Sequence, residues 1–151
     1  MPQPAVTRTR AAFSMSYGVE VNILANASRV WDLLTDAEGF RRWNSTVTGI
    51  DGHIREGERL RLRVPGTDRT FTPTVSGVVP RERMTWAGGF APMFKGVRRF
   101  LLRARPDGST DFSMHERFSG LMLPLVQRSM PDLGPVFERF AADLKREAEA
   151  A

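Results

Sequence analysis

Residues 96–118 read GVRRFLLRARPDGSTDFSMHERF, and this stretch decides the fold. Its centre, PDGS, combines the proline, aspartate and glycine that favour a tight turn. On either side apolar and polar residues alternate, which is typical of half-buried strands. Strands joined by so short a turn pair antiparallel, because parallel pairing needs a long crossover. We therefore predict an antiparallel hairpin whose strands cover residues 96–105 and 110–118.

The apolar residues of this hairpin show which side chains face the interior. Phe112 and Met114 share a parity with Glu116, and Phe100 shares one with Arg98. Pairing through a turn at residues 107–108 brings Arg98 opposite or diagonal to Glu116. Burying either charge alone is very costly, so an inward carboxylate and an inward guanidinium are expected to belong together.

Three roles for this pair stay open. In the first, Arg98 and Glu116 only satisfy each other's charge at the wall of a cavity. In the second, they orient a polar group of a ligand, and Arg98 recognises an anionic or carbonyl end. In the third, Glu116 acts as a general acid or base. The neighbouring guanidinium favours the ionised carboxylate, so a binding role ranks above a catalytic one.

The preceding residues predict further strands and two short helices. Strand-like alternation covers residues 13–25, and strands are also expected at 46–54, 58–64, 70–79 and 83–87. After the first strand, Asn26 and Asp36 are candidate N-caps of two short helices. The short turns between the later strands favour an antiparallel sheet.

The two ends of the chain are expected to differ. Residues 1–12 are largely polar and contain Pro2 and Pro4, which predicts a flexible N-terminal tail. Residues 133–144 carry apolar residues at helical spacing, which predicts a long helix that begins near Pro135. The sequence thus predicts one α+β domain over residues 13–151, in which a curved antiparallel sheet wraps around the C-terminal helix.

Composition argues against several classes of partner. The chain of 151 residues has a formal charge of +5, but its basic residues lack the interleaved aromatic residues that nucleic-acid binding requires. It has no cysteine, and His53 and His115 stand without carboxylates at ligand spacing, so no metal site is expected. No glycine-rich loop opens a helix, and no other cofactor is expected.

Membrane and secretion signals are not found in the sequence. No stretch reaches the roughly 20 apolar residues that span a bilayer, so no stable membrane insertion is expected. Residues 1–10 contain no apolar core of a signal peptide. Together with the absence of cysteine, this predicts a cytoplasmic location.

Three segments resemble the START-like or Bet v 1-like (SRPBCC) superfamily, especially its bacterial polyketide cyclase/dehydrase and lipid-transport branch. They are residues 21–36 with the Trp43-Asn44 pair, residues 83–86 and residues 106–120. The resemblance covers nearly all of the chain from Val19 onward. It implies a helix-grip fold with a hydrophobic pocket between sheet and long helix. It assigns no chemistry, because activities vary widely on this fold.

The expected function is the binding of a small hydrophobic molecule, such as a lipid, a polyketide-like compound or an aromatic compound, in an internal cavity. One alternative is a polyketide cyclase or dehydratase that uses the same cavity, with Glu116 as the candidate catalytic residue. Another is a protein-interaction module similar to activators of the Hsp90 ATPase, which predicts an exposed apolar patch. Whether the protein is an enzyme stays open, as does its oligomeric state, with a homodimer among the alternatives.

The expected ligand contacts come from the inward faces of the later strands, the segment before them and the long helix. Residues 88–94 and 121–126 are apolar but loop-like, and we expect them to flank the pocket mouth and to move when a ligand enters. The ligand-binding residues expected from the sequence are Trp86, Phe90, Phe94, Arg98, Phe100, Phe112, Met114, Glu116 and Phe137.

Overall fold

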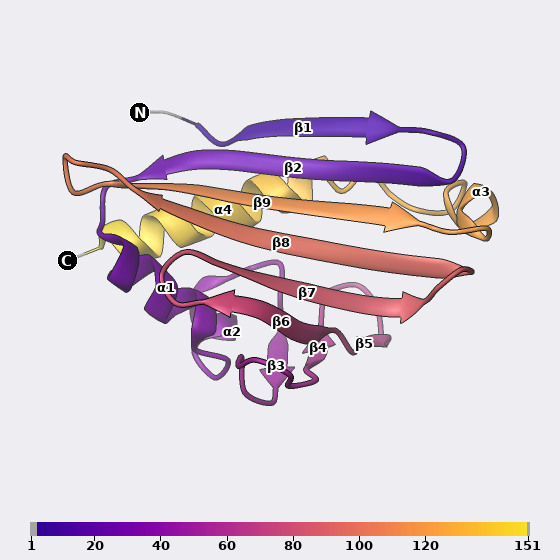
Figure 1. Ribbon diagram of the computed structural model, residues 1–151, viewed down its shortest axis with the longest axis horizontal. Helices are drawn as coiled ribbons and strands as arrows, with labels where there is room; N and C mark the ends of the chain where they lie inside the picture. The colour runs from indigo at the N-terminus through magenta and orange to yellow at the C-terminus, as the bar shows by residue number, and fades with distance from the viewer. Residues whose placement is uncertain (1–2, 151) are drawn as a thin grey trace.

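The computed structural model describes residues 3–150, and Figure 1 shows the arrangement of its strands and helices. In chain order they are β1 (Ala5–Arg10), β2 (Ser14–Ile23), α1 (Ala27–Thr35), α2 (Phe40–Trp43), β3 (Gly49–Asp51), β4 (Arg61–Arg63), β5 (Thr70–Phe71), β6 (Thr74–Val79), β7 (Arg83–Phe90), β8 (Phe94–Ala104), β9 (Thr110–Ser119), α3 (Leu123–Val126) and α4 (Gly134–Glu149).

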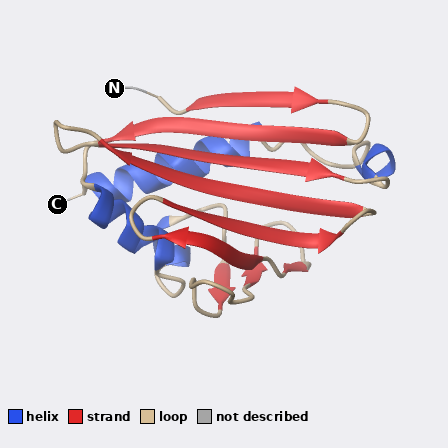
Figure 2. Ribbon diagram, in the orientation of Figure 1, coloured by secondary structure: helices blue, strands red, loops and turns tan. Residues whose placement is uncertain are grey.

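One large antiparallel sheet and the long helix α4 make up most of the molecule. The large sheet has the strand order β1-β2-β9-β8-β7-β6, and β3, β4 and β5 form a small separate sheet. In Figure 2, α4 lies behind the large sheet, against β1 and β2. The predicted α+β architecture, an antiparallel sheet around a C-terminal helix with two short helices after the expected first strand, is confirmed.

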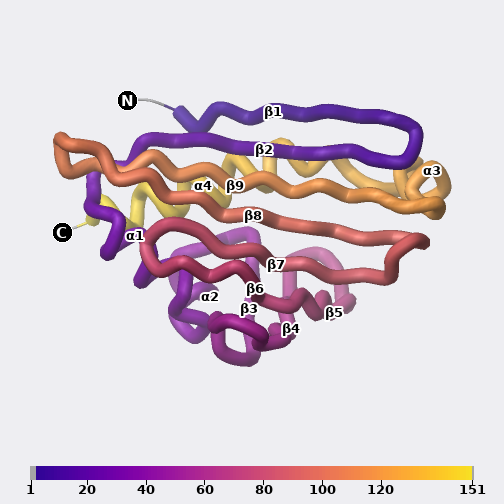
Figure 3. Tube along the Cα trace, viewed as in Figure 1, coloured from indigo at the N-terminus to yellow at the C-terminus, as the bar shows by residue number. Residues whose placement is uncertain are grey.

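The sheet begins earlier in the chain than expected. The prediction of a flexible tail is wrong for Ala5–Arg10, which form β1 and pair with β2 (Figure 3). Valine and threonine favour extended backbone, and Val6 also packs against the core. The side chain of Arg8 donates from Nε to Oδ1 of Asp132 at 2.9 Å, which ties β1 to the segment before α4. Residues 1–2 of the expected tail lie outside the described residues.

The expected strand at residues 70–79 is divided between the two sheets. Its first part, β5, pairs with β4, whereas its second part, β6, pairs with β7. The division falls at Pro73, which has no N–H to donate to a ladder. The carbonyl of Pro73 still accepts a hydrogen bond from the Leu60 N–H at 2.8 Å. The strand therefore passes from the small sheet to the large one at the proline.

The C-terminal half of α4 is fixed by buried polar contacts. Asp143 and Lys145 are charged, yet both are buried. Oδ2 of Asp143 accepts hydrogen bonds from N and Oγ of Ser45, each at 2.7 Å. Nζ of Lys145 donates to the carbonyl of Asn22 at 2.8 Å and to Oε2 of Glu149 at 2.6 Å. Satisfied in this way, the two charges anchor the helix to the segment after α2 and to β2.

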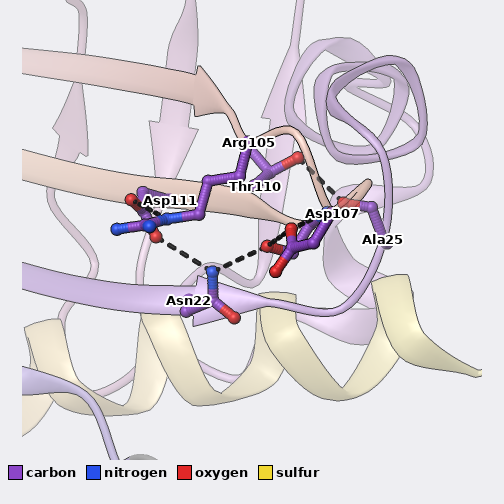
Figure 4. Close-up of polar contacts among 7 residues, drawn as sticks. Asn22, Ala25, Arg105, Asp107, Thr110 and Asp111 are labelled. Atoms are coloured by element: carbon purple, nitrogen blue, oxygen red, sulfur yellow. Dashed lines mark hydrogen bonds and ion pairs between the residues drawn. The ribbon is translucent and has the colours of Figure 1, made fainter.

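The predicted turn between β8 and β9 is confirmed, and a polar network holds it against the end of β2 (Figure 4). Nδ2 of Asn22 donates to Oγ of Ser109 at 3.1 Å and to Oδ1 of Asp111 at 2.9 Å. These contacts to Asn22, together with an ion pair to Arg105, hold the pKa of Asp111 below its usual range against the effect of burial. Hydrogen bonds from Ser109 likewise lower the pKa of Asp107. We interpret this network as structural, because it fixes the turn between β8 and β9 to the end of β2.

Candidate ligand-binding site

A row of four side chains crosses the large sheet on the face towards α4. In the register of the sheet, Tyr17 of β2 lies opposite Glu116 of β9, Glu116 lies opposite Arg98 of β8, and Arg98 lies opposite Trp86 of β7. The predicted pairing of Arg98 with Glu116 is confirmed, because Nε of Arg98 donates to Oε1 of Glu116 at 2.7 Å. The two side chains are 19% and 14% exposed, so a ligand can still reach them.

The guanidinium of Arg98 is held in a fixed place but is not saturated. Its Cζ lies 5.1 Å from the ring centroid of Phe137 and 5.9 Å from that of Phe140, both on α4. Such cation–π contacts orient a guanidinium and stabilise it. Of its N–H donors, only the one on Nε is bonded to a described residue. The donors on Nη1 and Nη2 can therefore bind a carboxylate or carbonyl oxygen.

On the side of the row towards α1, the space between sheet and helix is filled. Here Phe100, Phe112, Met114 and Phe140 are each 1% exposed. The rings of Phe112 and Phe140 stack with their centroids 6.2 Å apart. The expected ligand contacts Trp86, Phe100, Phe112, Met114 and Phe137 all belong to this buried core, and their contact with a ligand stays a prediction.

On the other side of the row, towards the turn between β7 and β8, the same face of the sheet is less covered. Phe94, Gly96 and Phe118 are only half-buried. The rings of Phe94 and Phe118 stack at 6.0 Å with 24° between their planes. Gly96 leaves space beside the ion pair that a side chain would occupy. A Cβ there would lie 3.2 Å from Oε2 of Glu116 and 3.4 Å from the Phe118 ring. An apolar surface thus adjoins a polar pair.

Trp86 adds an unused donor to the row. Its side chain is buried, with 3% exposure, and its Nε1–H has no hydrogen-bond partner among the described residues. Leaving a buried donor unpaired costs about 1–3 kcal/mol, so such groups in a native protein call for an explanation. The donor belongs to the residue paired with Arg98 in the sheet, which makes it a candidate contact for a ligand oxygen.

Phe90 lies apart from the other expected contacts. The expected loop at residues 88–94 is wrong, because β7 continues to Phe90 and β8 begins at Phe94, which leaves a turn of three residues. Phe90 is 84% exposed at this turn. Residues 121–126, the other expected flank, do adjoin the turn: the N–H groups of Leu121 and Met122 donate to the carbonyls at positions 92 and 93, at 3.0 and 2.9 Å. Movement of the two segments stays a prediction.

Among the hollows on the described surface, one reaches the row of four side chains and another does not. One, of about 240 Å³, meets the row at Tyr17, and its further lining residues are Arg8, Thr9, Arg10, Met15 and Asp132. The hydrogen bond from Arg8 holds the pKa of Asp132 below its usual range. The other, of about 480 Å³, is lined by residues 35–38 and 50–55 and has no residue in common with the row. The first hollow thus shares Tyr17 with the candidate site, whereas the second shares no residue with it.

Two residues of the site were not singled out from the sequence. Phe118 continues the inward parity of Glu116, so the alternation that placed the carboxylate also placed this ring. Tyr17 belongs to the apolar parity of the expected first strand. The sequence could not reveal that Tyr17 lies opposite Glu116, since that depends on the register between strands about 100 residues apart.

Residues 3–150 contain neither a metal-binding cluster nor a membrane-spanning helix. This part of the chain contains no cluster of three or more histidine and carboxylate side chains that could hold a metal ion. His115, which has the opposite parity to Glu116 on β9, is exposed. None of the helices described is long and apolar enough to cross a membrane.

Comparison with known proteins agrees with this architecture. The chain is similar to a conserved protein of unknown function from Enterococcus faecalis, with 16% identity, a TM-score of 0.69 and coverage of 97% of this chain and 80% of that one. A START superfamily protein from Mycobacterium smegmatis shares 19% identity at a TM-score of 0.65, with 89% and 97% covered. The di-domain ARO/CYC protein BexL of the BE-7585A biosynthetic pathway shares 17% identity at a TM-score of 0.72, with 94% of this chain but 52% of BexL covered.

At these identities the structures show the fold alone, and among curated proteins none is similar in sequence. The model of the family described as polyketide cyclase / dehydrase and lipid transport matches residues 12–149, which leaves only β1 and the extreme termini outside. The chain therefore belongs to this family, within the START-like (SRPBCC) superfamily.

Proposed function

We propose that the protein binds a small, largely hydrophobic molecule with one polar oxygen group, on the sheet face between the Arg98–Glu116 pair and the turn that joins β7 to β8. The observation that carries this proposal is an inward-facing ion pair that solvent still reaches, beside the stacked rings of Phe94 and Phe118. The apolar part of the ligand lies on the two rings, and its oxygen accepts from Arg98. A lipid, a polyketide-like molecule or an aromatic compound meets these requirements.

The charge of the site favours a neutral oxygen over an anion. Glu116 already neutralises Arg98, so a carboxylate bound beside them adds a net negative charge to a partly buried site. A carbonyl accepts the same hydrogen bonds from Nη1 and Nη2 without that cost. We therefore expect an ester, ketone or aldehyde to bind at least as well as the matching acid.

The first test compares the native and denatured masses of gently purified protein and identifies any molecule that is released. The second follows quenching of tryptophan fluorescence by decanoate and by methyl decanoate. Arg98→Met should weaken methyl decanoate binding about tenfold, as expected for loss of a hydrogen bond to a charged group. Arg99→Met is the matched control, because Arg99 is exposed on the next position of the same strand. Equal affinity of the two variants for methyl decanoate would show that Arg98 does not bind the ligand.

A polyketide cyclase- or dehydratase-type reaction is the second candidate, with Glu116 moving protons. It is supported by the position of this carboxylate beside the apolar surface and by family membership. With a linear polyketide mimic as substrate, Glu116→Gln should lower the rate and shift the pH–rate profile. An unchanged profile in this variant rules out Glu116 as the acid or base.

The third candidate is a protein-interaction module like the activators of the Hsp90 ATPase. The exposed apolar patch that it requires is present at one end of the large sheet. The cytoplasmic location stays part of the proposal, and it is supported by a chain without cysteine.

A further inference from the structure

Six large apolar side chains are exposed together at one end of the large sheet. They come from the turn between β1 and β2, the turn between β7 and β8, and the segment from the end of β9 through α3. These segments meet at the right-hand end of Figures 1 and 3. We call the set the tip patch, and its members, with exposed fractions, are Phe13 (54%), Phe90 (84%), Met93 (44%), Leu121 (58%), Met122 (38%) and Leu125 (69%).

Backbone contacts hold the three segments of the tip patch together. The Gly120 N–H donates to the carbonyl of Phe13 at 3.0 Å, and residues 121 and 122 donate to the turn between β7 and β8. Gly120 has a φ of +136°, and its Cα lies so close to the carbonyl of Met93 that a Cβ would clash. The apolar side chains are therefore presented on a preformed surface.

The charge around the tip patch is of one sign. Residues 8–17, 88–97 and 117–131 supply this end of the molecule and contain no aspartate or glutamate. The carboxylate that follows them, Asp132, is already paired with Arg8. Within these three ranges at the tip, four exposed basic residues form no ion pair with a described residue: Arg10, Lys95, Arg117 and Arg128.

We propose that the tip patch docks on the surface of a membrane that contains anionic lipids. Apolar side chains carried on separate turns can enter the interfacial region, while the basic residues around them contact the headgroups. This pairing of apolar tips with unopposed cations is the chemistry that such a surface recognises. A second copy of the chain fits less well, because face-to-face contact would bring the basic residues of both copies together without a carboxylate between them.

Docking at this end would turn the candidate ligand site towards the lipid. The site lies on the less covered half of the sheet face, and the Phe94–Phe118 ring pair lies between the Arg98–Glu116 pair and the tip patch. An apolar ligand could then exchange with the membrane without crossing water. The docking proposal rests only on the tip patch and its charges, so it stands even if no ligand binds.

The test is flotation of the full chain with vesicles of phosphatidylcholine alone and of phosphatidylcholine with 30% phosphatidylserine. We expect binding only to the anionic vesicles, and less of it as salt is raised. Leu121→Ser/Leu125→Ser should weaken binding at least tenfold through loss of apolar contact. Leu24→Ser/Leu101→Ser, which changes two exposed leucines elsewhere (63% and 48%), should change it less than twofold.

A second pair of variants tests the charges, and both variants lower the net charge by the same two units. Lys95→Ser/Arg128→Ser should weaken binding about fivefold for each cation lost. The control variant, Arg83→Ser/Arg103→Ser, removes two exposed cations from the opposite end of β7 and β8. Its change in the logarithm of vesicle affinity should be less than half of that for Lys95→Ser/Arg128→Ser.

Several results would overturn the proposal. These are absence of binding to anionic vesicles, equal losses in the tip and control variants, or a dimer in light scattering that Leu121→Ser/Leu125→Ser dissociates. Co-purification of an acidic protein in place of vesicle binding would assign the patch to a protein partner. Methyl decanoate binding is measured on the same protein, because it tests the proposed function separately. A protein that binds methyl decanoate but no vesicles would refute the docking proposal and leave the proposed function standing.

Discussion

Replacing Arg98 with methionine tests the ion pair at the centre of the sheet. Methionine is also long and unbranched, and it keeps apolar contact with the rings of Phe137 and Phe140. The substitution therefore removes the charge and the 2.7 Å hydrogen bond with little loss of packing. Glu116 is left facing inward, only 14% exposed, without its donor.

The magnitude follows from this partial burial. Breaking a fully buried pair by removing one partner costs about 3–5 kcal/mol, whereas an exposed pair contributes about 0–1 kcal/mol. At 19% and 14% exposure this pair lies between the limits, and loss of the cation–π contacts adds to the cost. We expect Arg98→Met to lower the free energy of unfolding by about 2–3 kcal/mol. For a chain of this size that lowers Tm by about 4–12 °C.

The assay is urea unfolding followed by tryptophan fluorescence at pH 7. Arg99→Met, on the exposed face of the same strand, should cost no more than about 0.5 kcal/mol. A double-mutant cycle with Glu116→Leu should give a coupling energy of about 1–2 kcal/mol, because this second change removes the carboxylate that Arg98→Met leaves unpaired. If Arg98→Met costs no more than Arg99→Met, or if the cycle shows no coupling, the argument from burial is refuted.

Two further predictions concern α4. Phe140→Ala should lower the free energy of unfolding by about 3–5 kcal/mol, because this ring is 1% exposed and its centroid lies within 6.2 Å of those of Phe40, Trp43, Phe100 and Phe112. Phe71→Ala, at a residue 46% exposed, should cost about 1 kcal/mol or less in the same urea assay, and equal costs would contradict the packing argument. Burial raises the pKa of Glu149, but hydrogen bonds from Lys145 and from the Leu24 N–H outweigh it, so the pKa is lowered from 4.5. A lowered folded-state pKa contributes stability above the unfolded value, and this stability is lost as pH falls below about 4.5. Glu149→Gln should therefore be less stable than the parent at pH 7 and closer to it at pH 3 in thermal unfolding, whereas a constant difference would contradict the linkage.

Local patterns were sufficient for the central hairpin. The turn residues between β8 and β9 and the alternation on both sides place Arg98 across from Glu116, because pairing through a short turn leaves little freedom of register. The buried stripe of α4 was predicted for the same reason, since helical spacing is also a local property. These features depend on residues close together in the sequence.

Features that depend on distant partners were not predicted. The strand β1 forms because β2 provides backbone partners along its whole length, and a run of six residues, four of them threonine or arginine, does not reveal this by itself. Gly88 and Gly89 indicated a loop, yet pairing with β8 extends β7 through both of them. Asp143 has the periodicity of a surface residue, and only the position of Ser45 buries it. In each case a partner far along the chain outweighed the local preference.

The two glycines at the site argue that the open half of the sheet face serves binding more than stability. Gly88 and Gly96 lie directly opposite each other on β7 and β8, one row beyond Trp86 and Arg98. A glycine inside a strand weakens it and commonly marks a close approach of a ligand or another backbone. At Gly88 a Cβ would make only ordinary contacts, the nearest at 3.5 Å, so packing does not require glycine there. At Gly96 a Cβ would press on the carboxylate of Glu116, which must keep its place to hold Arg98. The two glycines leave open space beside an ion pair that still has free donors. A binding surface requires such space, whereas a hydrophobic core would fill it with side chains.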